Sequence, residues 1–138
     1  HGYEQFREAS AFIPAEQEVV FLTISRENGC EYCMAAHSMI ADKMSKVPSD
    51  VTNAIRNDDN IADTKLAALN AFTRVMHHTR GLPDQSEVAS FLNAGYTERH
   101  ILDIVTAQSV KTLSNYTNHL FHTELDALFE EWKWKDHE

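Results

Sequence analysis

Two cysteines and a histidine form the most reactive pattern of side chains in this sequence. Cys30 and Cys33 are the only thiols, they enclose Glu31 and Tyr32 as Cys-x-x-Cys, and His37 stands four residues beyond the second thiol. An α-helix turns by about 100° per residue, so on a helix these three side chains would point within an arc of about 60°. Two thiols and an imidazole on one helix face predict either thiol redox chemistry or a metal site.

The redox interpretation depends on thiols placed in the first turn of a helix. Unpaired backbone N–H groups and the helix dipole favour a thiolate there, and Cys-x-x-Cys motifs lower a thiol pKa from about 8.5 to roughly 3.5–7.5. Cys30 and Cys33 could also close a disulfide with little backbone movement. We therefore predict a redox-active pair that cycles between dithiol and disulfide. The plain alternative is two unreactive buried thiols.

A zinc site is the second alternative for the same residues. Cys30 and Cys33 would supply two ligands and His37 a third, whereas a structural zinc site takes four. The histidines that could in principle converge on it from other helices are His77, His78, His119 and His122. The chain lacks the second ligand pair at short range that zinc fingers carry, so we predict no bound metal.

Glu18 stands directly before the apolar run Val19–Ile24. If Asn28-Gly29 folds two helices into an antiparallel pair, Glu18 lies about 16 Å of helix rise from that turn, which brings it closer to His37 than to Cys30. A buried carboxylate is costly unless it is paired, so His37 is its expected partner; a role at the helix dipole is the alternative. A neutral imidazole with an ordinary pKa near 6.5 could then accept a thiol proton.

Helical periodicity dominates the chain, and no sustained alternation of apolar and polar residues indicates a strand. Pro, Ser, Asp, Thr and Asn-Gly mark the helix ends. We predict one all-α domain over residues 1–138, with its core at about 12–129. The seven expected helices cover about 15–26, 30–44, 49–56, 63–80, 84–93, 97–121 and 125–132. The 30–44 helix is expected to bury Met44, and the 97–121 helix is expected to turn inward Ile101, Leu102, Ile104, Val105 and Leu113.

The composition argues against several classes of partner and location. The chain has 12 Lys and Arg against 21 Asp and Glu, a net charge of −9, and no basic cluster. We therefore expect it to bind neither nucleic acid nor an anionic membrane. No apolar run reaches the length of a membrane span, and the first residues lack the pattern of a secretion signal. Two closely spaced cysteines cannot form a disulfide framework, so we expect a reducing, cytoplasmic environment.

The order Glu18, Cys30-Glu31-Tyr32-Cys33, His37 resembles the alkyl hydroperoxidase D-like branch of the carboxymuconolactone decarboxylase superfamily. That branch has a Glu, then Cys-x-x-Cys, then a His four residues beyond the second Cys. Residues 115–119, Asn-Tyr-Thr-Asn-His, resemble an Asn-x-x-Asn-His segment of its peroxidase-related members. The resemblance covers residues 12–129 or so. It implies an all-α fold, a trimer or hexamer, and thiol-based reduction of hydroperoxides by an antioxidant oxidoreductase.

The resemblance also implies a role for each residue of the motif. Cys33 would attack the peroxide and Cys30 would resolve the product into a disulfide, while Glu18 and His37 would relay the proton that activates Cys33. The helix dipole alone would instead favour Cys30 as the thiolate, because it lies nearer the helix end. An external dithiol, such as a lipoyl-bearing protein, would reduce the disulfide. A thiol–disulfide oxidoreductase without peroxidase activity is the alternative.

The sequence supports three further expectations. No glycine-rich nucleotide motif is present, so no bound flavin or nicotinamide cofactor is expected. Well-studied family members have a His where this chain has Tyr32, and since a tyrosine is no base near pH 7, we expect Tyr32 to pack or donate a hydrogen bond. Trp132 and Trp134 give the tail more aromatic surface than a monomer readily hides, which predicts a homo-oligomer; coverage of the chain's own core is the alternative.

Overall fold

The computed structural model describes residues 1–136, and every regular element in that range is a helix. Six of the predicted helices are confirmed to within one or two residues at each end. The elements in chain order are α1 (Gly2–Ala9), α2 (Pro14–Glu27), α3 (Glu31–Lys43), α4 (Ser49–Asn57), α5 (Thr64–Thr79), α6 (Gln85–Asn93), α7 (Glu98–Leu120) and the 3-10 helix η1 (Ala127–Trp132).

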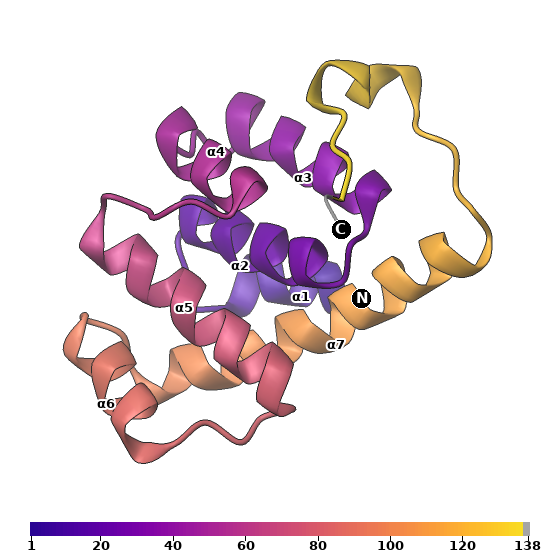
Figure 1. Ribbon diagram of the computed structural model, residues 1–138. Coiled ribbons are helices and arrows are strands. Elements are labelled where there is room, and N and C mark those ends of the chain that lie inside the picture. The colour runs from indigo at the N-terminus through magenta and orange to yellow at the C-terminus, as the bar shows by residue number, and fades with distance from the viewer. Residues whose placement is uncertain (137–138) are drawn as a thin grey trace.

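Helix α2 is the centre of the bundle. Figure 1 shows it in the middle of the molecule, with α3 and α4 on one side and α7 on the other. Its residues from Glu16 to Ser25 are all buried, and the five apolar side chains between Val19 and Ile24 have no exposed surface. A helix that is apolar around its circumference must be packed on all sides, and α5 completes the enclosure. None of the helices within residues 1–136 is long and apolar enough to cross a membrane.

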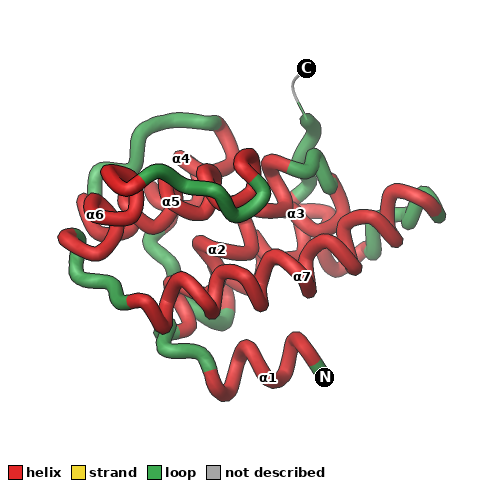
Figure 2. The backbone as a smooth tube through the Cα atoms, turned by 90° about the horizontal axis from the view of Figure 1, so that it is seen from below, coloured by secondary structure: helices red, strands yellow, loops and turns green. Residues whose placement is uncertain are grey.

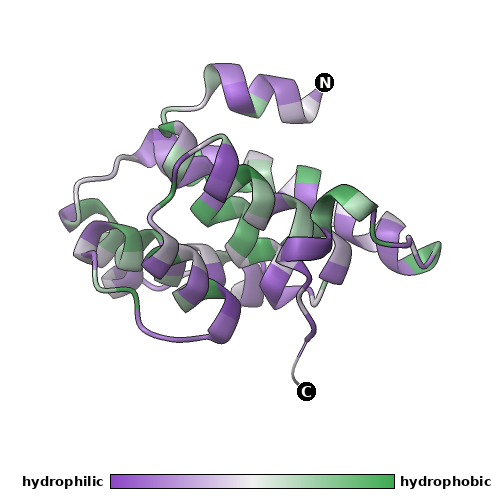
Figure 3. Cartoon of the chain, turned by 90° about the horizontal axis from the view of Figure 1, so that it is seen from above, coloured by the Kyte–Doolittle hydropathy of each residue, from purple (hydrophilic) through white to green (hydrophobic). Residues whose placement is uncertain are grey.

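Helix α1 was not predicted, and the core therefore begins earlier than residue 12. The helix runs alongside α7 at the edge of the bundle (Figure 2) and buries Phe6 against Phe12 and Phe21. Figure 3 shows that most of α1 is hydrophilic. Because Tyr3 and Phe6 are its only large apolar residues, the segment carries too little periodicity to indicate a helix by itself.

The tail differs from the α-helix predicted over residues 125–132. Its regular part is the 3-10 helix η1, and the chain is extended after Trp132. The guanidinium of Arg56 donates to the carbonyls of Trp132 and Lys133, each at 2.9 Å. Leu128 in this segment is 67% exposed. Trp134 is buried, and its indole Nε1 donates to the carbonyl of Arg56 at 2.9 Å. The core thus extends beyond residue 129, and Trp134 covers this chain rather than a partner.

Helix α7 presents to the core only part of the face that was predicted. Leu102, Val105 and Leu113 were expected inward, yet they are 65%, 50% and 73% exposed. Met44 at the end of α3 is exposed as well. The buried residues of α7 are instead Asp103, Ile104, Ala107, Lys111 and Asn115. Of the five residues predicted inward, Ile104 is buried and Ile101 packs against the core. The other three are exposed because the inner face of α7 also carries polar side chains that belong to the site described next.

Candidate active site

The two cysteines lie at the start of α3, directly after the turn that ends α2. Gly29 adopts a φ of 66°, a left-handed conformation that glycine takes at low cost, and so the turn predicted from Asn28-Gly29 is confirmed. Cys30 is the N-cap of α3, and its sulfur accepts a hydrogen bond from the backbone N–H of Cys33 at 3.3 Å. Both thiols are buried, with 1% and 3% of their surface exposed.

Glu18 and His37 form the buried pair that the sequence predicted. His37 Nδ1 lies 3.1 Å from Glu18 Oε1, and Arg7 Nη2 donates to both carboxylate oxygens at 2.9 and 3.0 Å. Burial alone would raise the pKa of Glu18, but the hydrogen bonds and charges of His37 and Arg7 outweigh it and lower the pKa. A carboxylate can only accept, so Nδ1 of His37 carries the hydrogen and Nε2 is left as an acceptor.

The Nε2 atom of His37 faces two donors. Lys111 Nζ lies 2.8 Å from it, and the hydroxyl of Tyr3 also donates to it. Lys111 Nζ in turn donates to Tyr3 Oη at 3.1 Å. Burial and the positive charge of Lys111 lower the pKa of His37 to about 4, against the opposing effect of Glu18. His37 is therefore neutral at pH 7, with Glu18 on one ring nitrogen and Lys111 and Tyr3 on the other.

Cys33, rather than Cys30, is the thiol held as a thiolate. A hydrogen bond from the Cys30 thiol is the main cause; burial opposes it, and the charge of Lys111 and the amides of Asn118 and Asn115 assist it, so the pKa of Cys33 falls to about 5. Asn118 Nδ2 lies 3.2 Å from the sulfur. The same hydrogen bond and burial raise the pKa of Cys30. This order agrees with the resemblance and disagrees with the dipole argument, because side-chain donors around Cys33 outweigh proximity to the helix end.

Comparison with known proteins gives one family. The carboxymuconolactone decarboxylase family matches residues 2–76, more than half of the 138 residues. The chain belongs to this family. A solved structure described as an uncharacterized peroxidase-related protein from Silicibacter sp. TM1040 is similar to it, with 17% identity, a TM-score of 0.78, and coverage of 93% of this chain and 68% of that one. At that identity the likeness shows the shared all-α fold. No curated protein matches the chain.

The family match ends before α7, although α7 contributes residues to the site. One of them, Lys111, was not predicted as a site residue from the sequence. Lys111 is 1% exposed and lies between His37 and the cysteines. Lysine is usually a surface residue, so nothing in its type suggested a buried position. Tyr3 and Arg7 were missed because they lie on the unpredicted α1; their spacing of four residues would place them on one helix face.

Tyr32, between the two cysteines, points away from them. Its hydroxyl donates to Asp126 Oδ2 at 2.6 Å, and its ring meets Phe129 edge-on with 5.8 Å between centroids. The prediction that Tyr32 packs or donates a hydrogen bond is confirmed. The hydrogen bond to Asp126 and burial raise its pKa to about 12. Tyr32 thus ties the start of α3 to the C-terminal segment.

Two of the four histidines proposed as additional zinc ligands have other partners. His77 Nδ1 pairs with the amide of Gln108 at 3.3 Å, and His78 Nε2 pairs with Glu27 Oε2 at 2.8 Å. Within residues 1–136, no three His, Cys, Asp or Glu side chains gather in a way that could hold a metal ion. The Cys-x-x-Cys pair therefore has no ligand set around it of the kind that structural zinc requires.

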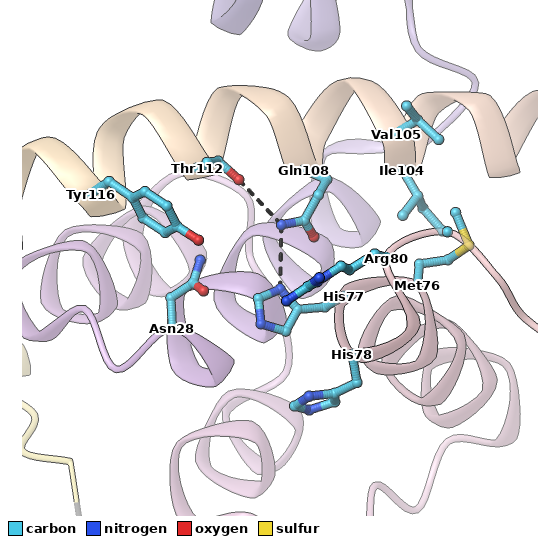
Figure 4. A pocket seen from close by; sticks show the side chains of 11 residues that line it. Asn28, Met76, His77, His78, Arg80, Ile104, Val105, Gln108, Thr112 and Tyr116 are labelled. Carbon is cyan, nitrogen blue, oxygen red and sulfur yellow. Dashed lines mark hydrogen bonds between the residues drawn. The ribbon is translucent and has the colours of Figure 1, made fainter.

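Two cavities lie near this site. The larger, of about 590 Å³, opens between the C-terminal ends of α2 and α5 and the middle of α7 (Figure 4), where Arg80, His77 and Gln108 face one another. Its wall residue Asn28 donates to Asn115 Oδ1 at 2.9 Å. The smaller, of about 380 Å³, lies between α1 and α7, and it is the one lined by residues that touch the site: Tyr3 and Asn118, beside the apolar Val110 and Leu113.

Proposed function

We propose that this protein is a thiol-dependent peroxidase that reduces hydroperoxides through a dithiol–disulfide cycle of Cys30 and Cys33. The observation that carries the proposal is the environment of Cys33, whose pKa near 5 makes it a thiolate at neutral pH, with a protonated second thiol beside it. The thiolate is the nucleophilic form of cysteine. A second thiol next to it can act as the resolving residue that closes the disulfide. The similar structure described as peroxidase-related supports this assignment.

The proposed cycle has three steps. The Cys33 thiolate attacks the O–O bond and becomes a sulfenic acid, and the Cys30 thiol condenses with it to a disulfide with loss of water. An external dithiol, such as a lipoyl-bearing protein, restores both thiols by exchange. Glu18 and His37 remain in the mechanism as a proton relay, but one that reaches Cys33 through Lys111 and Tyr3, since these two groups occupy His37 Nε2.

The smaller cavity is the proposed route of the substrate. Asn118 bonds the Cys33 sulfur and also lines this cavity, so a molecule in the cavity would lie against a residue that contacts the thiolate. The side chains of Val110 and Leu113 offer apolar surface to a hydrocarbon group. The cavity therefore favours an organic hydroperoxide over hydrogen peroxide.

The test is peroxide consumption by the purified protein. With a dithiol reductant the wild type should consume an organic hydroperoxide, and Cys33→Ser should abolish the activity. Cys30→Ser should react once and accumulate a sulfenic acid that a dimedone probe traps. A wild type that exchanges its disulfide with dithiols yet consumes no peroxide would be a thiol–disulfide oxidoreductase instead.

We also propose that the protein is a homo-oligomer, a trimer or hexamer as in its family. The aromatic residues of the tail do not support this proposal, because Trp134 is buried in its own chain. Its support is the outer face of α7, where large apolar side chains are at least half exposed and fall within an arc of about 80°. We call this set the α7 stripe: Leu102, Val105, Leu113, Tyr116 and Leu120.

A cytoplasmic location remains a prediction from the sequence.

A further inference from the structure

The buried cluster around His37 holds two cations, and they differ in their partners. Arg7 is paired with the carboxylate of Glu18 through contacts of 2.9 and 3.0 Å. The hydrogen-bond partners of Lys111 Nζ are the uncharged His37 Nε2 and Tyr3 Oη. Since a buried charge is costly without an opposite charge, Lys111 needs an anion. Glu18 is already bonded to Arg7, and the negative charge that acts most strongly on Lys111 is that of Cys33.

We propose that Lys111 is the acid of the reaction: its ammonium balances the Cys33 thiolate and then gives a proton to the oxygen that leaves when this thiolate attacks a hydroperoxide. The inference rests on the proposed peroxidase function, which assigns the attack to Cys33. It adds a proton donor that lies outside the segment matching the family.

The step balances without any further reactant. The Cys33 thiolate bonds to the terminal oxygen of ROOH, the O–O bond breaks, and the leaving RO⁻ takes a proton from Lys111, which gives Cys33–SOH, ROH and a neutral amine. The Cys30 thiol then attacks the sulfenic sulfur, and its proton leaves with the hydroxyl as water. The cluster has the same net charge before and after, because the thiolate and the ammonium disappear together. The hydroperoxide is reduced by two electrons and the two cysteines are oxidised to a disulfide.

Lys111 is the group around Cys33 best suited to donate that proton. His37 Nε2 carries no hydrogen at pH 7, and burial raises the pKa of Tyr3, which makes its hydroxyl a weaker acid. Burial lowers the pKa of Lys111 and the negative charge of Cys33 opposes this lowering, so the ammonium is favoured most while the thiolate is present. The titratable and charged groups that face Lys111 are Tyr3 and Arg7 from α1, Glu18 from α2, and Cys30, Cys33 and His37 from α3.

A redox measurement without peroxide tests whether oxidation of the two cysteines is coupled to loss of a proton from Lys111. Between pH 6 and 8, oxidation of the wild type should release two protons with two electrons, one from Cys30 and one from Lys111. Each proton changes the equilibrium constant tenfold per pH unit, which is 29.6 mV for a two-electron couple, so the midpoint potential should fall by about 59 mV per pH unit. A slope of about 30 mV in a wild type whose Cys33 alkylation pKa is near 5 would overturn the proposal.

The variant Lys111→Arg assigns the second proton. Arginine keeps the charge and does not deprotonate, so alkylation at pH 7 should stay fast while the slope drops to about 30 mV per pH unit. A folded variant that keeps the wild-type slope would contradict the role of Lys111. If the variant does not fold, nitrogen-15 NMR of the wild-type lysine side chains replaces it: one amine should be neutral in the disulfide form and charged in the dithiol form, and an unchanged lysine would overturn the proposal.

The choice of peroxide separates this inference from the proposed function. A general acid contributes roughly 10² to 10⁴ in rate when the leaving group needs a proton. Lys111→Arg should therefore slow single-turnover oxidation by an alkyl hydroperoxide about a hundredfold, and it should leave oxidation by a peroxycarboxylic acid, whose leaving carboxylate needs no proton, nearly unchanged. Equal slowing with both peroxides would refute proton donation. A wild type that reacts with neither would refute the peroxidase function, while the potential slope would still test the charge coupling.

Discussion

The side-chain amide of Asn118 donates to the sulfur of Cys33 across 3.2 Å, although 85 residues separate the two in sequence. This bond joins α7 to the first turn of α3, and Asn115, one turn earlier on α7, also stabilises the same thiolate. The family match, residues 2–76, contains the cysteines, His37 and Glu18 but none of α7. The electrostatic environment of the reactive thiol is thus built by a helix that lies outside the matching segment.

Replacing Asn118 should weaken the thiolate measurably. A hydrogen bond to a charged group is worth about 1.5–3 kcal/mol, and each pKa unit corresponds to about 1.4 kcal/mol. Asn118→Leu, which keeps the number and branching of the side-chain heavy atoms, should therefore raise the pKa of Cys33 by about 1 to 2. The rate of alkylation by iodoacetamide as a function of pH measures it. The exposed Asn60→Leu is the matched control and should leave the pKa unchanged. A Cys33 pKa that stays near 5 in Asn118→Leu would show that this amide contributes nothing.

His37 should make the fold sensitive to acid. Its folded pKa of about 4 lies below the ordinary value of about 6.5, so the unfolded chain binds the proton more readily. The free energy of unfolding should therefore be highest above pH 6.5 and fall as the pH drops from 6.5 to 4, by about 3 kcal/mol from this group. Urea denaturation at a series of pH values measures this loss.

The His37 contribution is obtained by comparison with His37→Gln at each pH, because Cys33 adds its own pH dependence above pH 5. The difference in unfolding free energy between the two proteins should shrink as the pH falls through this window. His119→Gln, at an exposed position, should follow the wild type. If the wild type and His37→Gln lost stability in parallel, the buried neutral state assigned to His37 would be incorrect.

The parts of the fold that could be predicted from the sequence are those whose local signals agree with their packing. Pro14 and Asn28-Gly29 bound α2, and its apolar run correctly indicates a helix buried on most sides. The pairing of Glu18 with His37 also followed from the sequence, since a buried carboxylate requires a partner. Here the geometry of an antiparallel helix pair was enough to choose that partner.

The parts that could not be predicted depend on contacts between distant segments. Lys111 is buried because Tyr3, His37 and Cys33 surround it, and these residues come from two other helices. Without them hydropathy places Lys111 outside, and it gives no sign that the inner face of α7 is partly polar. The end of η1 is likewise held by a distant residue, since Arg56 donates to the carbonyls of Trp132 and Lys133. No local pattern in residues 125–132 reveals that contact.

Tyr32 should be dispensable for the chemistry. It stands where well-studied relatives of this branch have a histidine, but its hydroxyl bonds Asp126 on the surface and it remains protonated with a pKa of about 12. Tyr32→Phe removes one exposed hydrogen bond, worth about 1 kcal/mol or less, and should lower the melting temperature slightly. Alkylation of Cys33 and peroxide consumption should keep the same pH profile from 6 to 8. If the pH dependence of either rate changed shape in Tyr32→Phe, the tyrosine would take part in proton transfer.

The α7 stripe should mediate self-association if the protein is an oligomer. Leu102 and Leu120 lie near its two ends and are 65% and 75% exposed, and neither touches the cysteine site. Burying an exposed leucine in an interface stabilises it by roughly 1.5–3 kcal/mol, whereas burying a glutamate there is costly. The double variant Leu102→Glu/Leu120→Glu should therefore shift a trimer or hexamer to the 15.7 kDa monomer in light scattering.

Leu82→Glu, at an 80% exposed loop position, is the matched control and should keep the wild-type mass. A wild type that is already monomeric at micromolar concentration would refute the oligomer, and a double variant that stays assembled would place the interface on another face.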